Sequence, residues 1–304
     1  FARSLMISEN HVRLAHYDRS GPYITPLCNI HSKPTLLVRL ILGLTCPNED
    51  VLGLDTSIQW AIDEETGRKV SGTIRVDEHS DENQTLTTVT YNLDMGKPPL
   101  IRPTIRGRGT VCWHAIHPST NEGVLIKDAW RSGERTSEVE HLRSAAGIRG
   151  VVELLAYQDF CAETRTFRPQ PFTAKDFGNK IKMRAVLKRY GASIWHFKTR
   201  LDLLHAVRDA LIGHRELYRK GILHRDVSVP NILFGSADAS EGSQGCLIDL
   251  DVAVRTELGV SPVPTTSRIG TRLYQSIFVL RSESDKLGVP HDYLDDLEAF
   301  FYVM

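Results

Sequence analysis

The stretch ILHRDVSVPNILF, residues 222–234, is the most specific pattern in the chain. It sets His224, Arg225 and Asp226 side by side and places Asn231 a few residues later. Phosphoryl transfer needs this spacing, because a carboxylate must meet the substrate hydroxyl while an amide oxygen binds the magnesium ion that neutralises the moving phosphate. The pattern predicts Asp226 as the catalytic base and Asn231 as a metal ligand. The alternative interpretation is an acidic turn between an amphipathic helix and a short strand.

A second acidic pattern follows in CLIDLDVA, residues 246–253, where an apolar strand runs into Asp249 and Asp251. A magnesium ion that bridges two phosphates prefers oxygen ligands and keeps several waters. We therefore predict that Asp249 and Asn231 together hold the metal. Taken alone, two aspartates at a strand end are also typical of a solvated turn.

Upstream, VLIKDAW at 124–130 has the pattern of a strand whose lysine, Lys127, binds the α and β phosphates of ATP. One hairpin earlier, RGRGTVCW at 106–113 supplies Gly107 and Gly109, whose backbone could close over the phosphates. Cys112 stands where the third glycine of GxGxxG is expected, which predicts a looser cover.

The segment TSEVEHLRSAAG at 136–147 is predicted to be a helix that ends at Gly147. We expect Glu138 to be the acidic partner of Lys127. The open alternative is that Glu140 forms a capping box with Ser137, which leaves Glu138 in the first turn, where a negative charge simply suits the helix dipole.

Together these motifs resemble protein kinases, and in particular the fungal-type protein kinase family. HRDVS, DLD and DDLE occur in the order that is typical of that family, and ENHVRLAHYDRSG at 9–21 and LGLDTSIQW at 52–60 resemble its leader. The resemblance covers nearly the whole chain. It implies a bilobal α+β kinase-like fold that uses ATP and Mg²⁺ to phosphorylate serine or threonine hydroxyls of a protein substrate.

The resemblance also implies further roles. GTRLYQSIFVL at 270–280 is similar to the substrate-binding loop, with Thr271 where such kinases contact the acceptor and the catalytic aspartate. Asp296 matches the aspartate that opens the central helix of the C-lobe. Arg225 would brace a phosphorylated activation segment, and we expect activating phosphorylation among Thr265, Thr266 and Ser267.

Four positions depart from the common kinase pattern. Cys112 is the first, and Ser228 stands where a lysine usually neutralises the γ-phosphate, although the fungal family tolerates this serine. Asp251 replaces the glycine of DFG, which again resembles the family, and Phe278 occupies the glutamate position of the APE-like motif. Cys112, Ser228 and Phe278, together with the expected absence of the later C-lobe helices, keep a nucleotide-binding pseudokinase or scaffold open as a second class.

A third class is a small-molecule phosphotransferase of the aminoglycoside/choline type. The missing lysine and the acidic DLD sequence motivate it. Arg225 and the activation segment that ends at GTRLY argue against it.

The predicted organisation is a β-rich leader at 1–96, an N-lobe at 97–157 and an incomplete C-lobe at 158–304. In the leader we expect a helix at 36–44 and strands at 69–76 and 85–93. In the C-lobe we expect a helix that is capped by Thr199 and ends at Gly221, with one apolar face formed by Leu201, Leu204, Val207 and Leu211.

Composition limits the partners. The 304 residues include 37 basic and 37 acidic side chains, so no net charge attracts nucleic acid or an anionic membrane. The apolar run LLVRLILGL at 36–44 is short and contains Arg39, which predicts a buried helix or strand and no membrane span. Five cysteines without a CxxC pair indicate reduced thiols and an intracellular protein, cytoplasmic or nuclear. The sequence does not indicate an oligomeric state.

The chain starts at Phe1 and stops at Met304 inside an expected helix, so we expect truncation at both ends. The last predicted helix carries four large apolar side chains for which the sequence suggests no packing partners: Leu297, Phe300, Phe301 and Val303.

Overall fold

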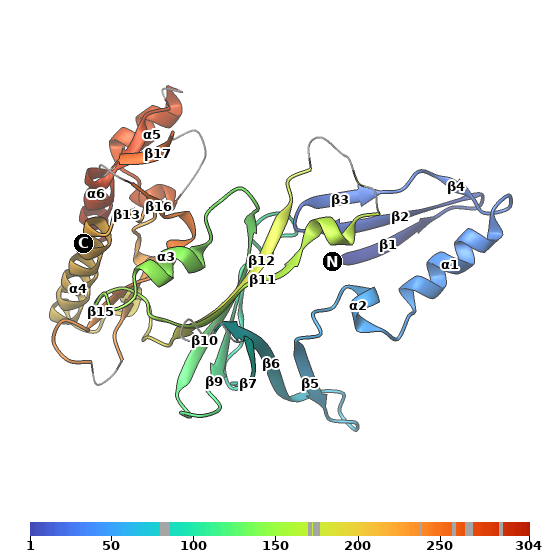
Figure 1. Cartoon of the computed structure of the whole chain (residues 1–304), viewed down its shortest axis with the longest axis horizontal. Coiled ribbons are helices and arrows are strands. Elements are labelled where there is room, and N and C mark those ends of the chain that lie inside the picture. Colours follow the sequence, from blue (N-terminus) through green and yellow to red (C-terminus); the bar gives the residue numbers. More distant parts are fainter. Residues whose placement is uncertain are drawn as a thin grey trace. The chain divides into compact units, whose positions relative to one another are not determined.

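The computed structural model describes residues 1–79, 86–169, 172, 177–236, 239–256, 260–264, 270–285 and 288–304 (Figure 1). It is a mixed α+β protein with large antiparallel sheets, as the sequence predicts. The chain divides into two compact units. The first comprises Phe1–Arg135 and Ala156–Val186, and the second comprises Thr136–Leu155 and Leu187–Met304.

A four-stranded antiparallel sheet begins the first unit. It contains β1 (Ala2–Ile7), β2 (His11–Asp18), β3 (Gly21–Ile24) and β4 (Cys28–Asn29). The spatial order is β1-β2-β3, and β4 pairs with the free end of β2. Gly21 adopts φ +117° where β2 turns into β3, a conformation that favours glycine.

An eight-stranded sheet follows in the order β11-β12-β10-β9-β7-β6-β5, with β8 paired to β9. Its strands are β5 (Ile58–Ile62), β6 (Lys69–His79), β7 (Leu86–Leu93), β8 (Leu100–Ile101), β9 (Val111–Ile116), β10 (Gly123–Ser132), β11 (Leu154–Glu163) and β12 (Lys180–Lys188). The predicted strands at 69–76 and 85–93 are confirmed as β6 and β7. Alternate residues such as Ile74, Val76, Ala115 and Ile126 point into one apolar core.

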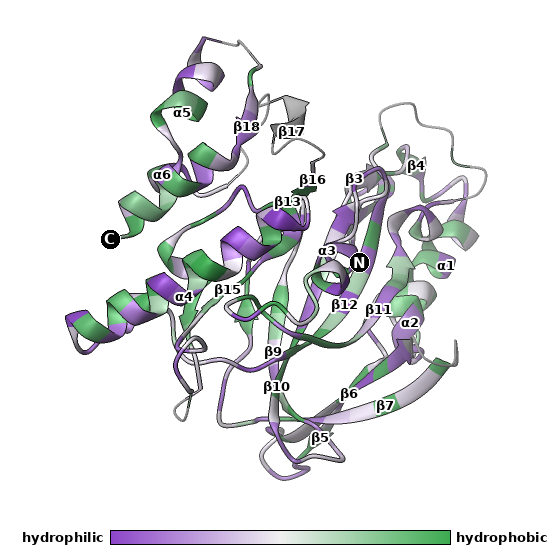
Figure 2. Ribbon diagram, turned by 60° about the vertical axis from the view of Figure 1, so that its left-hand side comes forward, coloured by the Kyte–Doolittle hydropathy of each residue, from purple (hydrophilic) through white to green (hydrophobic). Residues whose placement is uncertain are grey.

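The predicted helix at 36–44 is confirmed as α1 (Pro34–Leu44), which Pro34 begins. Its predicted burial is wrong, because α1 has no buried residue and Val38, Ile41 and Leu42 are exposed. The helix packs on the short α2 (Glu49–Leu52), and its apolar residues, green in Figure 2, stay accessible.

The second unit is mainly helical. Its helices are α3 (Glu138–Ser144), α4 (Arg200–Arg219), α5 (Ile277–Ser284) and α6 (Tyr293–Val303). Its short strands are β13 (Ile222–Leu223), β14 (Ile232–Phe234), β15 (Gly245–Leu247), β16 (Val254–Arg255), β17 (Val260–Pro264) and β18 (Pro290–Asp292). They form three antiparallel pairs, β13 with β16, β14 with β15, and β17 with β18.

Helix α4 begins as predicted, with a capping box between Thr199 and Asp202. Its predicted apolar face is wrong, because Leu201, Leu204 and Leu211 are exposed and only Val207 is buried. The buried face consists instead of small or polar residues: Ala206, Asp209, Ala210, Gly213 and His214, with Leu217. Small side chains occupy this face because β15 and the loop at Gly150 pack closely on the helix, where a larger side chain would clash.

Helix α6 corrects part of the expectation about its four apolar side chains. Phe300 and Val303 are buried, and the Phe300 ring lies 5.5 Å from the ring of His214 in α4. Leu297 and Phe301 are exposed. Among the described residues, no helix combines the length and the apolar character that crossing a membrane requires.

Candidate active site

The side chain of the predicted base, Asp226, is held by Thr271, which lies in the predicted substrate-binding loop. Oδ1 of Asp226 accepts a hydrogen bond of 2.8 Å from Oγ1 of Thr271 and one of 2.7 Å from its backbone nitrogen. Thr271 begins the 3-10 turn Arg272–Tyr274, so the segment GTRLY is anchored directly on the carboxylate. A carboxylate that accepts hydrogen bonds on one oxygen keeps a fixed orientation, which leaves Oδ2 as the atom able to take a proton.

Gly270 makes this contact possible. It adopts φ +87°, and a Cβ atom here would lie 2.8 Å from the carbonyl oxygen of Arg225. Any other residue would therefore be strained in its backbone and would push Thr271 away from Asp226.

The backbone before Asp226 is fixed by Asp296 of α6. Oδ2 of Asp296 accepts a hydrogen bond of 3.1 Å from the nitrogen of His224, and Oδ1 accepts one of 3.0 Å from the nitrogen of Arg225. The side chain of His224 adds two further bonds. Its Nδ1 accepts from the nitrogen of Asp226, and its Nε2 donates to the carbonyl oxygen of Ile248, just before Asp249.

The charge of Asp296 is supported by two histidines. His214 of α4 and His291 of β18 lie 2.9 Å and 3.0 Å from its oxygens. Burial, the largest effect, favours the neutral carboxyl, but the hydrogen bonds from His214 and His291 outweigh it and hold the pKa of Asp296 far below its usual range. Asp296 is thus a buried carboxylate that connects α6 to α4 and to the backbone before Asp226.

The predicted metal ligands lie at adjacent ends of two paired strands, Asn231 just before β14 and Asp249 just after β15. Asn231 immediately precedes β14, and its carbonyl oxygen accepts from the nitrogen of Ile248, the residue before Asp249. Asn231 Nδ2 donates to the carbonyl oxygen of Asp226 over 2.8 Å, which leaves the amide oxygen as the atom that can ligate a cation. Asp249 adopts φ 69° and Arg225 φ 67°, conformations that are rare for residues with side chains and that concentrate at functional sites.

These two residues fit a magnesium ion that is shared with phosphate. One amide oxygen and one carboxylate are hard ligands, and Mg²⁺ commonly takes the rest of its octahedron from waters and phosphate oxygens. The described residues contain no cluster of three or more histidine, cysteine, aspartate or glutamate side chains that could hold a metal without such a bridging ligand.

Helix α3 brings Glu138 to the same unit. The side chain of Ser137 accepts from the nitrogen of Val139 and caps the helix, which puts Glu138 in the first turn. Glu138 is 2 % exposed, and α3 packs against the 3-10 turn Leu250–Val252 that follows Asp249. A carboxylate that merely suited the helix dipole would remain in water, so the burial of Glu138 favours a specific role.

The departures from the kinase pattern have different settings. The Ser228 side chain is fully buried, and its hydroxyl has no hydrogen-bond partner among the described residues. Because a serine hydroxyl is neutral, Ser228 supplies no charge to a phosphate. Phe278 is half exposed in α5, whose first turn is held instead by α6, through Ser276 with Asp295 and the Ile277 nitrogen with Glu298.

Lys127, Gly107 and Gly109 belong to the first unit. Lys127 lies buried in β10, directly across from Cys112 of β9. Gly107 and Gly109 lie in the connection between β8 and β9, and both have positive φ. The structure thus puts the glycine-rich segment in the hairpin that precedes the lysine strand.

The strand that carries Lys127 is fixed by a buried ion pair that the sequence did not indicate. Arg184 of β12 donates to both carboxylate oxygens of Asp128, over 2.6 Å and 2.8 Å. It also donates to Ser57 Oγ and to the carbonyl oxygen of Arg75. A two-pronged arginine contact of this kind sets strand position as well as charge balance.

Sequence reasoning missed His214, His291 and Gly270. A histidine at the end of a buried helix face and a histidine just before DYLDDLE are usable signals only when the partner, Asp296, is already known to be buried. Gly270 gave no distinct signal, because a glycine in a loop is compatible with both positive and negative φ.

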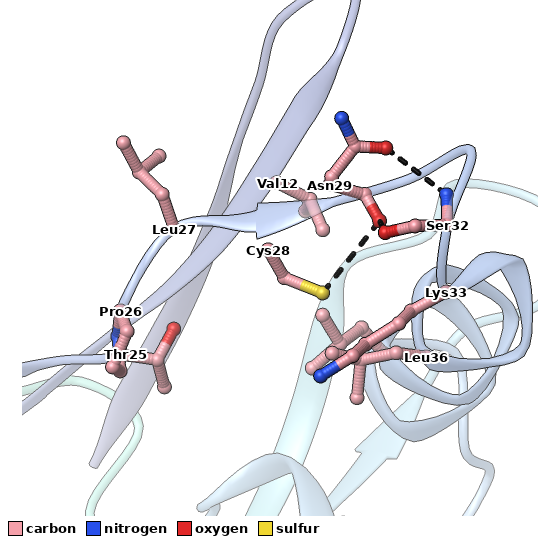
Figure 3. Close-up of a pocket in the computed structure, with 10 residues that line it drawn as sticks. Val12, Thr25, Pro26, Leu27, Cys28, Asn29, Ser32, Lys33 and Leu36 are labelled. Atoms are coloured by element: carbon pink, nitrogen blue, oxygen red, sulfur yellow. Dashed lines mark hydrogen bonds between the residues drawn. The ribbon is translucent and has the colours of Figure 1, made fainter.

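Two features lie apart from these residues. The predicted phosphorylation positions Thr265, Thr266 and Ser267 are outside the described residues. A hollow of 440 Å³ beside α1 is lined by residues that include Val12, Cys28, Lys33 and Leu36 (Figure 3). None of the predicted site residues lines this hollow.

A family model described as fungal protein kinase matches the chain over residues 1–170 and 162–304. The two matches overlap and together span the whole sequence. Curated proteins give no match.

Proposed function

Since this chain belongs to the fungal protein kinase family, we propose that it transfers the γ-phosphate of ATP to serine or threonine hydroxyls of protein substrates. The observation that carries the proposal is the contact between Thr271 and Asp226, over 2.8 Å. It joins the expected substrate loop to the expected base.

Asp226 would accept the proton of the substrate hydroxyl as that oxygen attacks the γ-phosphorus, while the bond from the γ-phosphorus to the bridging oxygen breaks and ADP leaves. The hydrogen bonds from Thr271 orient the carboxylate, and Asp296 fixes the backbone that presents it. Catalysis of phosphoryl transfer depends mainly on such positioning and on charge stabilisation.

Asn231 and Asp249 would hold Mg²⁺, which neutralises phosphate charge when bound. Lys127 would bind the α and β phosphates with Glu138 as its acidic partner, and Gly107 and Gly109 would cover them, as the family resemblance implies. Arg225 would brace a phosphorylated activation segment. Because Ser228 stands where a lysine is usual, neutralisation of the γ-phosphate charge would depend more heavily on the metal.

By the same resemblance, we propose that the fold is bilobal and kinase-like, with a leader at 1–96, an N-lobe at 97–157 and a C-lobe at 158–304. The leader would be an integral part of the N-lobe sheet, because β5, β6 and β7 belong to the same sheet as β10, which carries Lys127.

A pseudokinase is the second candidate, and the observation that favours it is the buried Ser228, which supplies no charge for the γ-phosphate. The test is an assay with γ-labelled ATP and Mg²⁺ against a protein mixture and, separately, a panel of aminoglycosides and choline. Label on protein serine or threonine supports the proposal. Label on a small alcohol would indicate the third class, and nucleotide binding without transfer would identify a pseudokinase.

A further inference from the structure

The glycine-rich segment is a loop whose Arg108 carbonyl oxygen accepts a hydrogen bond of 2.8 Å from the nitrogen of Trp130 in β10. It joins Ile101 of β8 to Val111 of β9, and the nitrogen of Arg102 donates to the carbonyl oxygen of Thr110 to close it. A loop of this length loses much conformational freedom when it closes over a ligand, and that loss weakens binding. A contact that orders the loop in advance would strengthen it.

Arg19, in the turn between β2 and β3, makes such a contact. Its guanidinium group donates hydrogen bonds to the carbonyl oxygens of Thr104 and Ile105, the latter over 3.2 Å. Its own carbonyl oxygen accepts a hydrogen bond of 3.2 Å from the nitrogen of Gly107. One residue of the leader therefore binds three backbone groups of the loop.

Gly109 completes the contact. The Arg19 guanidinium lies so close to Gly109 that a Cβ atom at this position would clash with it. Glycine is therefore favoured at position 109 for two reasons: it leaves room for Arg19, and it adopts a positive φ.

The turn that presents Arg19 is itself anchored. Asp18 accepts from Arg168 over 2.8 Å, and both side chains are almost completely buried. Arg168 also donates to the carbonyl oxygen of Gly21. Ser20 Oγ contacts Thr164 Oγ1 at 2.6 Å and the carbonyl oxygen of Gly178 at 2.7 Å. Residues on both sides of Arg19 are therefore tied to the segment that links β11 to β12.

We propose that Arg19 is a positioning residue that holds the glycine-rich loop, residues 102–110, in place for nucleotide. The hairpin formed by β2 and β3 is anchored to the segment that links β11 to β12, and through Arg19 it restricts the motion of the loop. The loop's role in binding ATP rests on the proposed function, whereas the brace itself rests on the contacts of Arg19.

The test compares wild type with Arg19→Met, which keeps the apolar stem, and Arg19→Lys, which keeps the charge and can reach one carbonyl. Arg68→Met is the matched control, because Arg68 is an exposed arginine in another turn of the same unit. Each protein is examined by backbone hydrogen exchange, by Mg-ATP binding and by steady-state kinetics.

In Arg19→Met we expect faster exchange in residues 102–110 and unchanged exchange in β9 and β10. We expect Mg-ATP affinity to fall by about 3- to 30-fold, the effect of losing two charge-assisted hydrogen bonds at a half-exposed site. KM for ATP should rise with kcat nearly unchanged, Arg19→Lys should recover part of the affinity, and Arg68→Met should match wild type.

Unchanged exchange in the loop of Arg19→Met would overturn the brace, whatever the nucleotide data show. Faster exchange with unchanged Mg-ATP affinity would overturn the positioning role. Faster exchange in a protein whose wild type binds no nucleotide would contradict the proposed function and leave the brace standing, so the two failures are distinguishable.

Discussion

The carboxylate of Asp296 lies 3.1 Å from the backbone nitrogen of His224, although the two residues are 72 positions apart in the chain. The same carboxylate accepts hydrogen bonds from Arg225, His214 and His291. Because all of these groups are buried, none can turn to water if Asp296 is lost. The orientation of the segment before Asp226 therefore depends on one side chain of α6.

We predict that Asp296→Ala lowers the free energy of unfolding by about 3–5 kcal/mol, because it leaves buried donors without an acceptor. Urea unfolding followed by fluorescence measures this. Asp285→Ala, at an exposed aspartate just after α5, is the control and should change stability by less than about 0.5 kcal/mol. Equal stabilities of the two variants would refute the anchoring role.

Thr271 gives a prediction about catalysis. Thr271→Val removes the Oγ1 bond to Asp226 and should lower kcat by about 10- to 100-fold, since a misoriented base loses most of its advantage. Thr271→Ser keeps the hydroxyl and should retain most activity. Equal kcat in the valine and serine variants would show that the hydroxyl has no part in catalysis.

Asp249 gives a prediction about the metal. Asp249→Asn should weaken ATP binding in the presence of Mg²⁺ by about tenfold or more, because it would remove one of the two proposed protein ligands of the metal. In chelator, wild type and variant should bind ATP with similar affinity. Calorimetric titration with and without Mg²⁺ checks both statements, and Asp285→Asn, at an exposed aspartate, controls for the change in net charge. An unchanged magnesium effect in Asp249→Asn would remove Asp249 from the metal site.

Two buried histidines make stability depend on pH. Burial lowers the pKa of His224, against the opposing charges of Asp296 and Asp226, and burial together with the charge of Arg255 lowers the pKa of His141. In the unfolded chain both imidazoles titrate near 6.5. Below that pH the unfolded state binds more protons than the folded state, so stability falls as pH falls.

We expect these two groups to reduce the free energy of unfolding by about 1–2.5 kcal/mol between pH 7 and pH 5.5. Urea titrations at several pH values measure the slope. His141→Gln should make the slope shallower, whereas replacement of exposed His31 by glutamine should leave it unchanged. A slope that is the same in all three proteins would contradict this assignment.

The sequence predicted the residues of the candidate site better than the packing around them. His224, Asp226 and Asn231 are close in the sequence, so their relative positions depend mainly on local backbone conformation. The structure joins them by hydrogen bonds between residues two and five positions apart. The predicted face of α4 was wrong, because the backbone of Gly245 in β15 lies directly against the backbone of Ala206, and apolar periodicity does not reveal which side of a helix such a close contact will bury. The contact of Arg19 with Thr104 and Ile105 was not predictable, because it spans about 85 residues of sequence and depends on how the leader hairpin folds.

The most direct test of the central claim is the turnover of Asp226→Asn with γ-labelled ATP, Mg²⁺ and protein substrate. The variant keeps the size of the side chain and the contact with Thr271 but removes the base. We expect kcat to fall by about two to four orders of magnitude with Mg-ATP affinity within about threefold of wild type, since a general base acts mainly in the transition state. Turnover equal to that of wild type would contradict the assignment of Asp226 and with it the proposed mechanism.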